Sequence, residues 1–166
     1  MRQEHVSQAG RGRLTSLNVL FKITFMSQVN VQFSVASHVM AALGSRHGEP
    51  IRSAELASSV NADASFVRRI VSKLAKAGLV TTTRGKGGAC ALARPPSQIT
   101  LLDIYKASEA PATFAVHDYL VQGGCRVSRN IKGCMGDILR ESQDDFEQSL
   151  SRKTLSDIVT AIERAR

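Results

Sequence analysis

Residues Asp63–Arg94 have the sequence DASFVRRIVSKLAKAGLVTTTRGKGGACALAR, from which the fold can be predicted. Asp63 is a good helix cap, apolar residues then recur every three to four positions, and Gly78 stands where a helix ends in a left-handed residue. The next residues, LVTTT, are β-branched and predict a strand. Arg84–Gly88 must turn, because its glycines tolerate positive φ, and a second strand follows. Helix, strand, cationic turn and strand predict a winged helix-turn-helix.

The predicted helix has an apolar stripe and a polar outer face. We expect the stripe in the core: Phe66, Val67, Ile70, Val71 and Leu74. At the helix start, hydroxyl and guanidinium groups can bond base edges or phosphates, and we predict DNA contacts by Ser65, Phe66, Arg68 and Arg69. The turn is a thin cationic tip suited to a narrow minor groove, which adds Arg84, Gly85, Lys86 and Gly87.

A glycine-rich turn can also cradle a nucleotide phosphate. This one lacks the Walker spacing, and it follows a helix and a strand instead of opening a helix. The nucleotide alternative is therefore weaker than the wing.

Charge is distributed unevenly. The net charge is +8. Residues 31–96 carry nine Lys/Arg against three Asp/Glu, a balance of +6, while residues 97–166 carry nine against ten, a balance of −1. A polyanionic partner requires such a concentration, with a generic solvated basic surface as the alternative.

The other segments predict further helices, and the fold class is mainly α with a small β wing. One helical face holds Phe33, Ala36, Val39, Met40 and Leu43. Ser53 is expected to cap a short helix that buries Leu56 and Val60. Thr100 and Asp103 form a capping box, and Thr154 caps a last helix.

Beyond Pro111 we expect a loop that ends in QGGCRVSRNIKGCMGD, followed by a long amphipathic helix. The apolar residues of that helix are Ile138, Leu139, Phe146 and Leu150. Its length and the small remaining core indicate self-association, and packing against its own domain is the alternative. We therefore expect an N-terminal extension at 1–25, a winged helix-turn-helix domain at 26–96, and a sensor loop with dimerisation helices at 97–166.

Composition limits the location of the protein. Three cysteines, Cys90, Cys125 and Cys134, do not make a disulfide scaffold and favour a reducing cytoplasm. No stretch reaches the roughly 20 apolar residues that span a bilayer. The run Leu14–Phe25 weakly resembles a signal peptide, but Lys22 interrupts it. We expect no membrane association.

From Met26 onward the chain resembles the Rrf2 family of bacterial winged-helix repressors, which includes IscR-like and NsrR-like regulators. The wing matches the family pattern at Arg84, Gly85, Gly87, Gly88, Leu92 and Ala93. The following helix start matches at Ile99, Thr100, Leu101, Asp103 and Ile104, and VNVQFSVASHVMAAL matches the first helix. Ala89 and Cys90 depart from the usual glycine and tyrosine. The resemblance implies a homodimer formed through the long helix, and two-fold symmetry then predicts a pseudo-palindromic operator in double-stranded DNA.

The resemblance bears on cofactors as well. Family members with an iron–sulfur cluster place three cysteines in the loop before the long helix, whereas this chain has Cys125 and Cys134 there. The motif CRVSRNI resembles the YwnA-like branch, which lacks the triad. We therefore expect no cofactor; the alternative is a cluster completed by His117, Asp118 or a partner subunit.

The cysteine pair lies among cations that favour thiolates, namely Arg126, Arg129 and Lys132. We predict a redox sensor in which Cys125 is oxidised and then resolved by Cys134 or by a cysteine of the other subunit. The competing interpretation is two ordinary small apolar residues. Zinc is disfavoured, because C-x-x-C spacing and paired histidines are lacking.

Catalysis is not expected, since no Ser/His/Asp arrangement, paired carboxylates or nucleotide loop occurs. The predicted function is a DNA-binding transcriptional regulator, with a winged helix that binds only proteins as the rival. The excess positive charge, to which Arg68, Arg69 and Lys73 contribute, argues for DNA.

Overall fold

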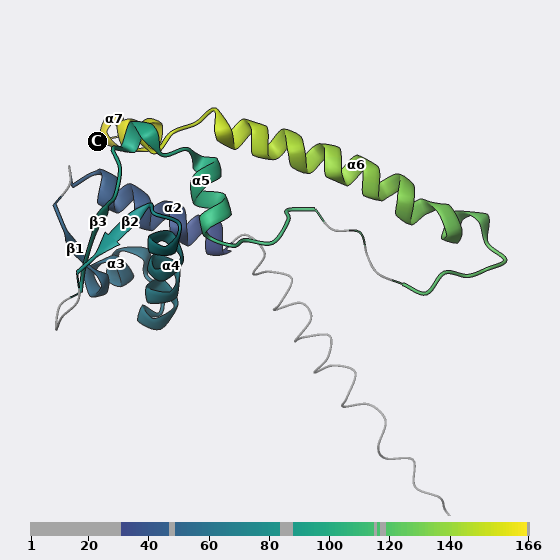
Figure 1. Cartoon of the computed structure of the whole chain (residues 1–166), viewed down its shortest axis with the longest axis horizontal. Coiled ribbons are helices and arrows are strands. Elements are labelled where there is room, and N and C mark those ends of the chain that lie inside the picture. Colours follow the sequence, from purple (N-terminus) through teal and green to yellow (C-terminus); the bar gives the residue numbers. More distant parts are fainter. Residues whose placement is uncertain (1–30, 47–48, 84–87, 115, 117–118, 166) are drawn as a thin grey trace, which may run out of the picture.

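The computed structural model describes residues 31–46, 49–83, 88–114, 116 and 119–165. It is mainly helical with a small sheet (Figure 1). The elements in order are α2 Val31–Gly44, β1 Ile51–Arg52, α3 Ser53–Val60, α4 Ala64–Lys76, β2 Val80–Thr82, β3 Ala89–Leu92, a 3-10 turn Pro96–Gln98, α5 Leu101–Ala107, α6 Arg126–Ser151 and α7 Leu155–Arg164. The order of α3, α4, β2 and β3 is that of a winged helix-turn-helix, which confirms the predicted fold class.

The sheet has the strand order β1-β3-β2, and both pairings are antiparallel. Val80 pairs with Leu92 across the predicted hairpin, and Ile51 pairs with Cys90 on the other side of β3. Strand β1 is not predicted by the sequence pattern, which indicates only a polar link before α3. Two residues show no alternation, and this strand exists only because β3 supplies its partner.

The ends of α4 follow the sequence prediction. The Asp63 carboxylate accepts hydrogen bonds from the backbone N–H groups of Ser65 and Phe66, each at 3.0 Å. Gly78 adopts a φ of 70°, the N–H of Gly78 donates to the Ala75 carbonyl, and that of Leu79 donates to the Leu74 carbonyl. This pair of bonds is a Schellman motif, and Leu79 is buried beneath it.

The start of α3 differs from the prediction. Ser53 is the first helical residue and not the cap, and Arg52 in the cap position makes no side-chain hydrogen bond to the helix. The Ser53 N–H instead donates to the Gly88 carbonyl at 3.2 Å. The helix begins directly after β1, and the carbonyl of Gly88, next to β3, therefore accepts the Ser53 N–H, which a capping side chain would otherwise accept. Leu56 is buried as expected, and Val60 is half-buried against the core.

Helix α2 lies at the centre of the core and contacts α3, α4, α5, α7 and β3. A Cβ atom on Gly44 would lie 2.8 Å from Cγ2 of Val159, so α7 crosses α2 at a point where only glycine fits. The same core includes Ile99, Ile104 and Leu155. The core therefore continues past residue 96. The boundary between residues 26–96 and 97–166 is proposed as a division of function and not of packing.

Helices α5 and α7 are joined at their first residues. Each begins with a capping box, Thr100 with Asp103 and Thr154 with Asp157, as the sequence predicted for Thr100 and in part for Thr154. The Leu101 N–H donates to the Lys153 carbonyl, and the Leu155 N–H donates to the Ile99 carbonyl, both at 2.8 Å. These bonds anchor the C-terminal end of α6, which Lys153 follows, to the winged part.

Helix α6 runs away from the winged part over 26 residues (Figure 1). Residues 126–137, which we predicted as loop, are helical. Cys125 caps the helix, since its Sγ accepts from the Ser128 N–H at 3.4 Å. Glycine costs about 1 kcal/mol relative to alanine inside a helix. Gly133 and Gly136 therefore weaken this helix without ending it, and the glycine-rich composition misled the prediction.

Candidate nucleic-acid interface

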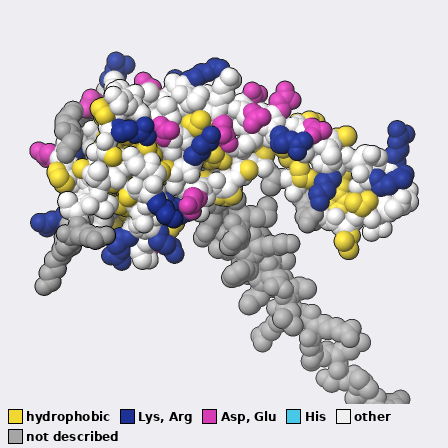
Figure 2. Space-filling model, in the orientation of Figure 1, with side chains coloured by type: hydrophobic (Ala, Val, Ile, Leu, Met, Phe, Trp, Pro, Cys, Tyr) yellow, Lys and Arg dark blue, Asp and Glu magenta, His cyan; other side chains and the backbone are white. Residues whose placement is uncertain are grey.

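The outer face of α4 is polar and exposed. Ser65, Arg68 and Arg69 are all exposed, while Val67, Ile70 and Leu74 are buried on the inner face. Lys and Arg side chains gather on the lower edge of the winged part, over α3 and α4 (Figure 2). The polar side chains predicted to meet DNA therefore share one face with a cluster of positive charge.

Ser65 serves the helix cap as well as the outer face. Its hydroxyl donates a hydrogen bond to the Asp63 carboxylate. This bond and the N–H of Phe66 are the main causes that lower the pKa of Asp63, and the positive charge of Arg68 adds to them. Since the hydroxyl proton is used, the Ser65 oxygen can only accept from a ligand, as from an exocyclic amino group of a base.

Phe66 and Arg69 form a pair on the same turn. The Arg69 guanidinium carbon lies 5.7 Å from the centre of the Phe66 ring, which is half-buried against the core. A cation over an aromatic face is held there by the ring quadrupole. In this structure Phe66 orients Arg69, in addition to any contact with DNA.

A depression of about 290 Å³ separates α4 from the sheet. Arg68 and Ser72 line it from α4, Thr82 from β2, and Cys90 from β3. Sequence reasoning missed Ser72 and Thr82 as site residues. Ser72 follows Arg68 by four positions and so lies on the same helical face, a signal that the sequence did contain.

The base of the wing is closed by hydrogen bonds. The Thr83 N–H donates to the Ala89 carbonyl at 3.0 Å, and the Ala89 N–H donates to the Thr83 hydroxyl oxygen at 3.2 Å. The predicted wing contacts Arg84, Gly85, Lys86 and Gly87 lie outside the described residues, and their contact with DNA stays a prediction.

Cys90 is a core residue. It lies in the central strand, only 2% of it is exposed, and burial raises the pKa of its thiol. The departure from tyrosine at this position therefore places a small apolar group in the core beside the depression.

Lys73 does not belong to the outer face, although we counted it among the charges available to DNA. Its ammonium contacts Gln32 Oε1 at 2.7 Å, the Ser108 carbonyl oxygen at 3.2 Å and Glu109 Oε2 at 3.0 Å. The Lys73 ammonium is therefore bound within the protein and is not available to DNA.

The two exposed cysteines lie on one helix. Cys125 caps α6 and Cys134 follows nine residues later, about 13.5 Å along the axis at about 1.5 Å per residue. Disulfides join Cα atoms up to about 7 Å apart. The predicted resolution of Cys125 by Cys134 of the same chain is therefore wrong for this helical state, and only a cysteine of another subunit is left for that role.

The same geometry bears on an iron–sulfur cluster. Cys90 is buried in the sheet, and the two other thiols do not converge on one point. Within the described ranges, no group of three or more Cys, His, Asp or Glu is placed to hold a metal ion. His117 and Asp118 lie outside these ranges. The described thiols thus do not fit a cluster held by one chain.

Part of α6 exposes apolar side chains. Val127, Ile131, Met135 and Ile138 are 67%, 40%, 36% and 54% exposed, and their three- and four-residue spacing places them on one side of the helix with Cys134. We call these five residues the free-end stripe. Hydrophobic side chains are visible at this end of α6 (Figure 2). Of the predicted apolar residues, only Ile138 belongs to it, because Leu139, Phe146 and Leu150 are half-buried.

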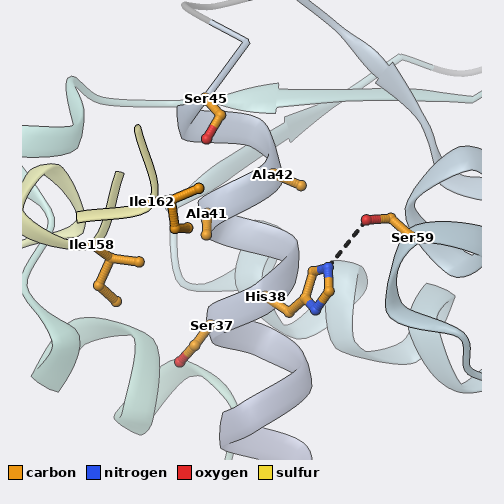
Figure 3. Close-up of a pocket in the computed structure, with 8 residues that line it drawn as sticks. All are labelled: Ser37, His38, Ala41, Ala42, Ser45, Ser59, Ile158 and Ile162. Atoms are coloured by element: carbon orange, nitrogen blue, oxygen red, sulfur yellow. Dashed lines mark hydrogen bonds between the residues drawn. The ribbon is translucent and has the colours of Figure 1, made fainter. Parts of the chain in front are cut away.

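A second groove, of about 380 Å³, lies between α2, α3 and α7 (Figure 3). Ile158 and Ile162 of α7 face α2, and His38 of α2 pairs with the Ser59 hydroxyl of α3 at 3.1 Å. The Ser37 hydroxyl is buried beside it without a hydrogen-bond partner. His38 is exposed, although its ring is bonded to Ser59.

None of the helices in the described part of the chain is both long enough and apolar enough to cross a membrane.

Comparison with known proteins agrees with this architecture. Residues 29–161 match the model of the Rrf2 family, described as "Iron-dependent Transcriptional regulator". The chain is 31% identical over 132 residues to the HTH-type transcriptional regulator YwnA of Bacillus subtilis, which covers 79% of this chain and 96% of YwnA.

Solved structures share the fold. A transcriptional regulator from Lactobacillus plantarum superposes with a TM-score of 0.67 at 24% identity, over 81% of this chain and 91% of that one. CymR, the global cysteine regulator of Bacillus subtilis, gives 0.56 at 24% identity, over 78% and 94%.

The match over most of the chain defines a class: this is a winged-helix transcriptional regulator. The chain belongs to the Rrf2 family.

Proposed function

We propose that the protein is a homodimeric repressor that binds a pseudo-palindromic operator in the cytoplasm and responds to cysteine oxidation. The observation that carries the DNA part is the outer face of α4, where Ser65, Arg68 and Arg69 are exposed beside a wing. Arginine is suited to bidentate contacts with guanine or phosphate, and the acceptor oxygen of Ser65 adds a contact of opposite polarity.

The dimer part is supported by the free-end stripe. α6 projects from the winged part, and none of its 26 residues, all of them described, is fully buried. Apolar side chains in such a row are expected to be covered by a partner, and a second α6 would cover them with matching chemistry. Two-fold symmetry would then place two α4 helices on successive turns of the major groove.

The signal part is supported by the position of Cys134 on the free-end stripe. A thiol in a subunit interface can react with a thiol of the other chain, and a polar oxidised sulfur there disturbs apolar packing. Cys125 at the helix start is exposed and can be oxidised in the same way.

Binding to duplex DNA across a salt series tests the proposed function. We expect steep loss of affinity as salt rises, because Lys and Arg release condensed counterions from phosphates. Arg69→Ala should weaken binding to every sequence by about tenfold and lower the salt slope by about 1, if Arg69 contacts a phosphate.

Arg152→Ala is the matched control, since it removes the same charge from the end of α6 and should leave the slope unchanged. If wild-type protein binds no duplex at low salt, the winged helix serves another partner. If Arg69→Ala and Arg152→Ala behave alike, the face of α4 is not the interface.

A further inference from the structure

The Lys73 ammonium joins three elements. It lies on the last turn of α4, and its partners come from α2 (Gln32), from the residue that ends α5 (Ser108) and from the next residue (Glu109). The Lys73 side chain is 26% exposed. Partial burial of an ammonium is costly unless each of its donors finds an acceptor, and here three acceptors lie within 3.2 Å.

The chain beyond α5 is held in one geometry. Ser108 is fully buried, its hydroxyl donates to the Tyr105 carbonyl at 2.7 Å, and it accepts from the Ala110 N–H at 3.3 Å. Glu109 has a φ of 52°, which few non-glycine residues adopt. The ion pair with Lys73 and the hydrogen bonds of Ser108 maintain this unfavourable conformation.

The other end of this segment is bound to α6. The Tyr105 hydroxyl donates to the Pro111 carbonyl at 3.1 Å and accepts from the Gln143 amide of α6 at 3.2 Å. The Gln143 side-chain carbonyl accepts from the Thr113 N–H at 2.9 Å. Residues 108–113 therefore touch α4 at one end and α6 at the other, and we call them the exit segment.

Aromatic rings support the same connection. The Tyr105 ring makes edge contacts with Phe33 of α2 and Phe146 of α6, each with ring centres 5.4 Å apart. Tyr105 thus links the core helix, the exit segment and α6 in one rigid cluster.

We propose that Lys73 is a positioning residue for DNA binding, which fixes α4 to the exit segment and, through Tyr105 and Gln143, to α6. The inference rests on the proposed function, because α6 carries the expected dimer contact. Lys73 does not touch DNA; it sets the angle at which each α4 meets the groove, and so the spacing of the two α4 helices of a dimer.

Lys73→Met tests this inference, because methionine keeps an unbranched side chain and removes the charge and the donors. Lys76→Met is the control: Lys76 is exposed on the same last turn and loses the same charge. We expect Lys73→Met to bind duplex about tenfold more weakly than Lys76→Met. The salt slope should be no lower for Lys73→Met than for the control, since no phosphate contact is lost.

A double-mutant cycle separates positioning from simple loss of stability. Gln143→Leu breaks the link at α6, and Lys73→Met should then weaken binding less than threefold further, because the connection is already open. If Lys73→Met is too unstable in a urea titration, Glu109→Gln takes its place. It removes the ion pair at an exposed side chain and should show part of the expected loss of duplex binding.

Three results would overturn the inference: equal affinity of Lys73→Met and Lys76→Met, penalties of Lys73→Met and Gln143→Leu that simply multiply, or a slope reduced by one phosphate contact in Lys73→Met alone. Failure of wild-type protein to bind duplex would count against the proposed function instead, so the two failures are distinguishable.

Discussion

At the scale of single residues, several side chains perform a structural task and sit in the candidate interface at once. Ser65 completes the cap of α4 through Asp63 and still offers its oxygen outward. Phe66 fills the edge of the core and holds the Arg69 guanidinium. The local structure of α4 and the placement of its polar groups therefore depend on the same atoms.

Gly44 allows a prediction at this scale. Gly44→Ala adds a Cβ that would lie 2.8 Å from Val159 Cγ2. α7 must shift, and overpacking of this kind costs about 1–3 kcal/mol. Urea denaturation should show this loss of stability.

Gly133→Ala serves as the control for Gly44→Ala. A Cβ at Gly133 meets nothing within 4 Å, and it points away from the free-end stripe. Alanine there should raise stability by up to about 1 kcal/mol, because it favours the helix. A destabilisation of the same size in both variants would show that the close crossing of α2 and α7 is not the cause.

At the scale of the element, the two ends of α6 have different tasks. Tyr105 and Phe146 join the part near the C-terminal end to the winged part, and the free-end stripe lies near the N-terminal end. The sequence places apolar residues at both ends, so its amphipathic pattern alone does not divide them between the chain's own core and a partner.

Ile131→Glu tests the free-end stripe. We expect this variant to sediment as a monomer where the wild type sediments as a dimer, because a carboxylate in the centre of an apolar interface loses its hydration. Operator affinity should fall at least 100-fold, since a monomer grips only one half-site.

Arg129→Glu places a carboxylate two residues from Ile131, on the opposite side of α6, and should stay dimeric. A dimer that persists in Ile131→Glu would move the subunit interface away from the free-end stripe.

At the scale of the whole molecule, the candidate signal site and the DNA-facing helix are at different places, and α6 connects them. Cys134 lies on the projecting part of α6, whereas Arg68 and Arg69 lie on α4 (Figure 1). Under the proposed function, oxidation of Cys134 would therefore act on DNA binding through the dimer arrangement and the exit segment.

Peroxide treatment tests this signal. We expect it to weaken operator binding at least tenfold in the wild type and to produce a cross-linked dimer on a non-reducing gel, reversed by a thiol reductant. Cys134→Ser and Cys125→Ser should each lower the response if both thiols take part. Cys90 should stay unmodified in a mass spectrum, because it is buried. An unchanged response in both serine variants would remove the cysteines from the mechanism.

The local elements of this protein could be predicted from short stretches of its sequence. Asp63, Gly78, Thr100 and Thr154 each mark a helix end through bonds to near neighbours, and the predicted caps formed at all four. The family, the wing hairpin and the polar outer face of α4 followed from the same local information. Such features depend on residues a few positions apart, so a short segment of the sequence is enough to predict them.

Contacts between residues far apart in the chain could not be predicted in this way and are seen only in the folded structure. Lys73 looked like a groove-facing cation and is bound by Gln32, Ser108 and Glu109, up to 41 residues away. β1 formed because β3 was beside it, and the helix from Arg126 placed Cys134 on an apolar stripe instead of in a loop. The Lys73 contacts and the β1–β3 pairing depend on long-range packing, which compensates the partial burial of the ammonium, and local propensity does not describe such packing.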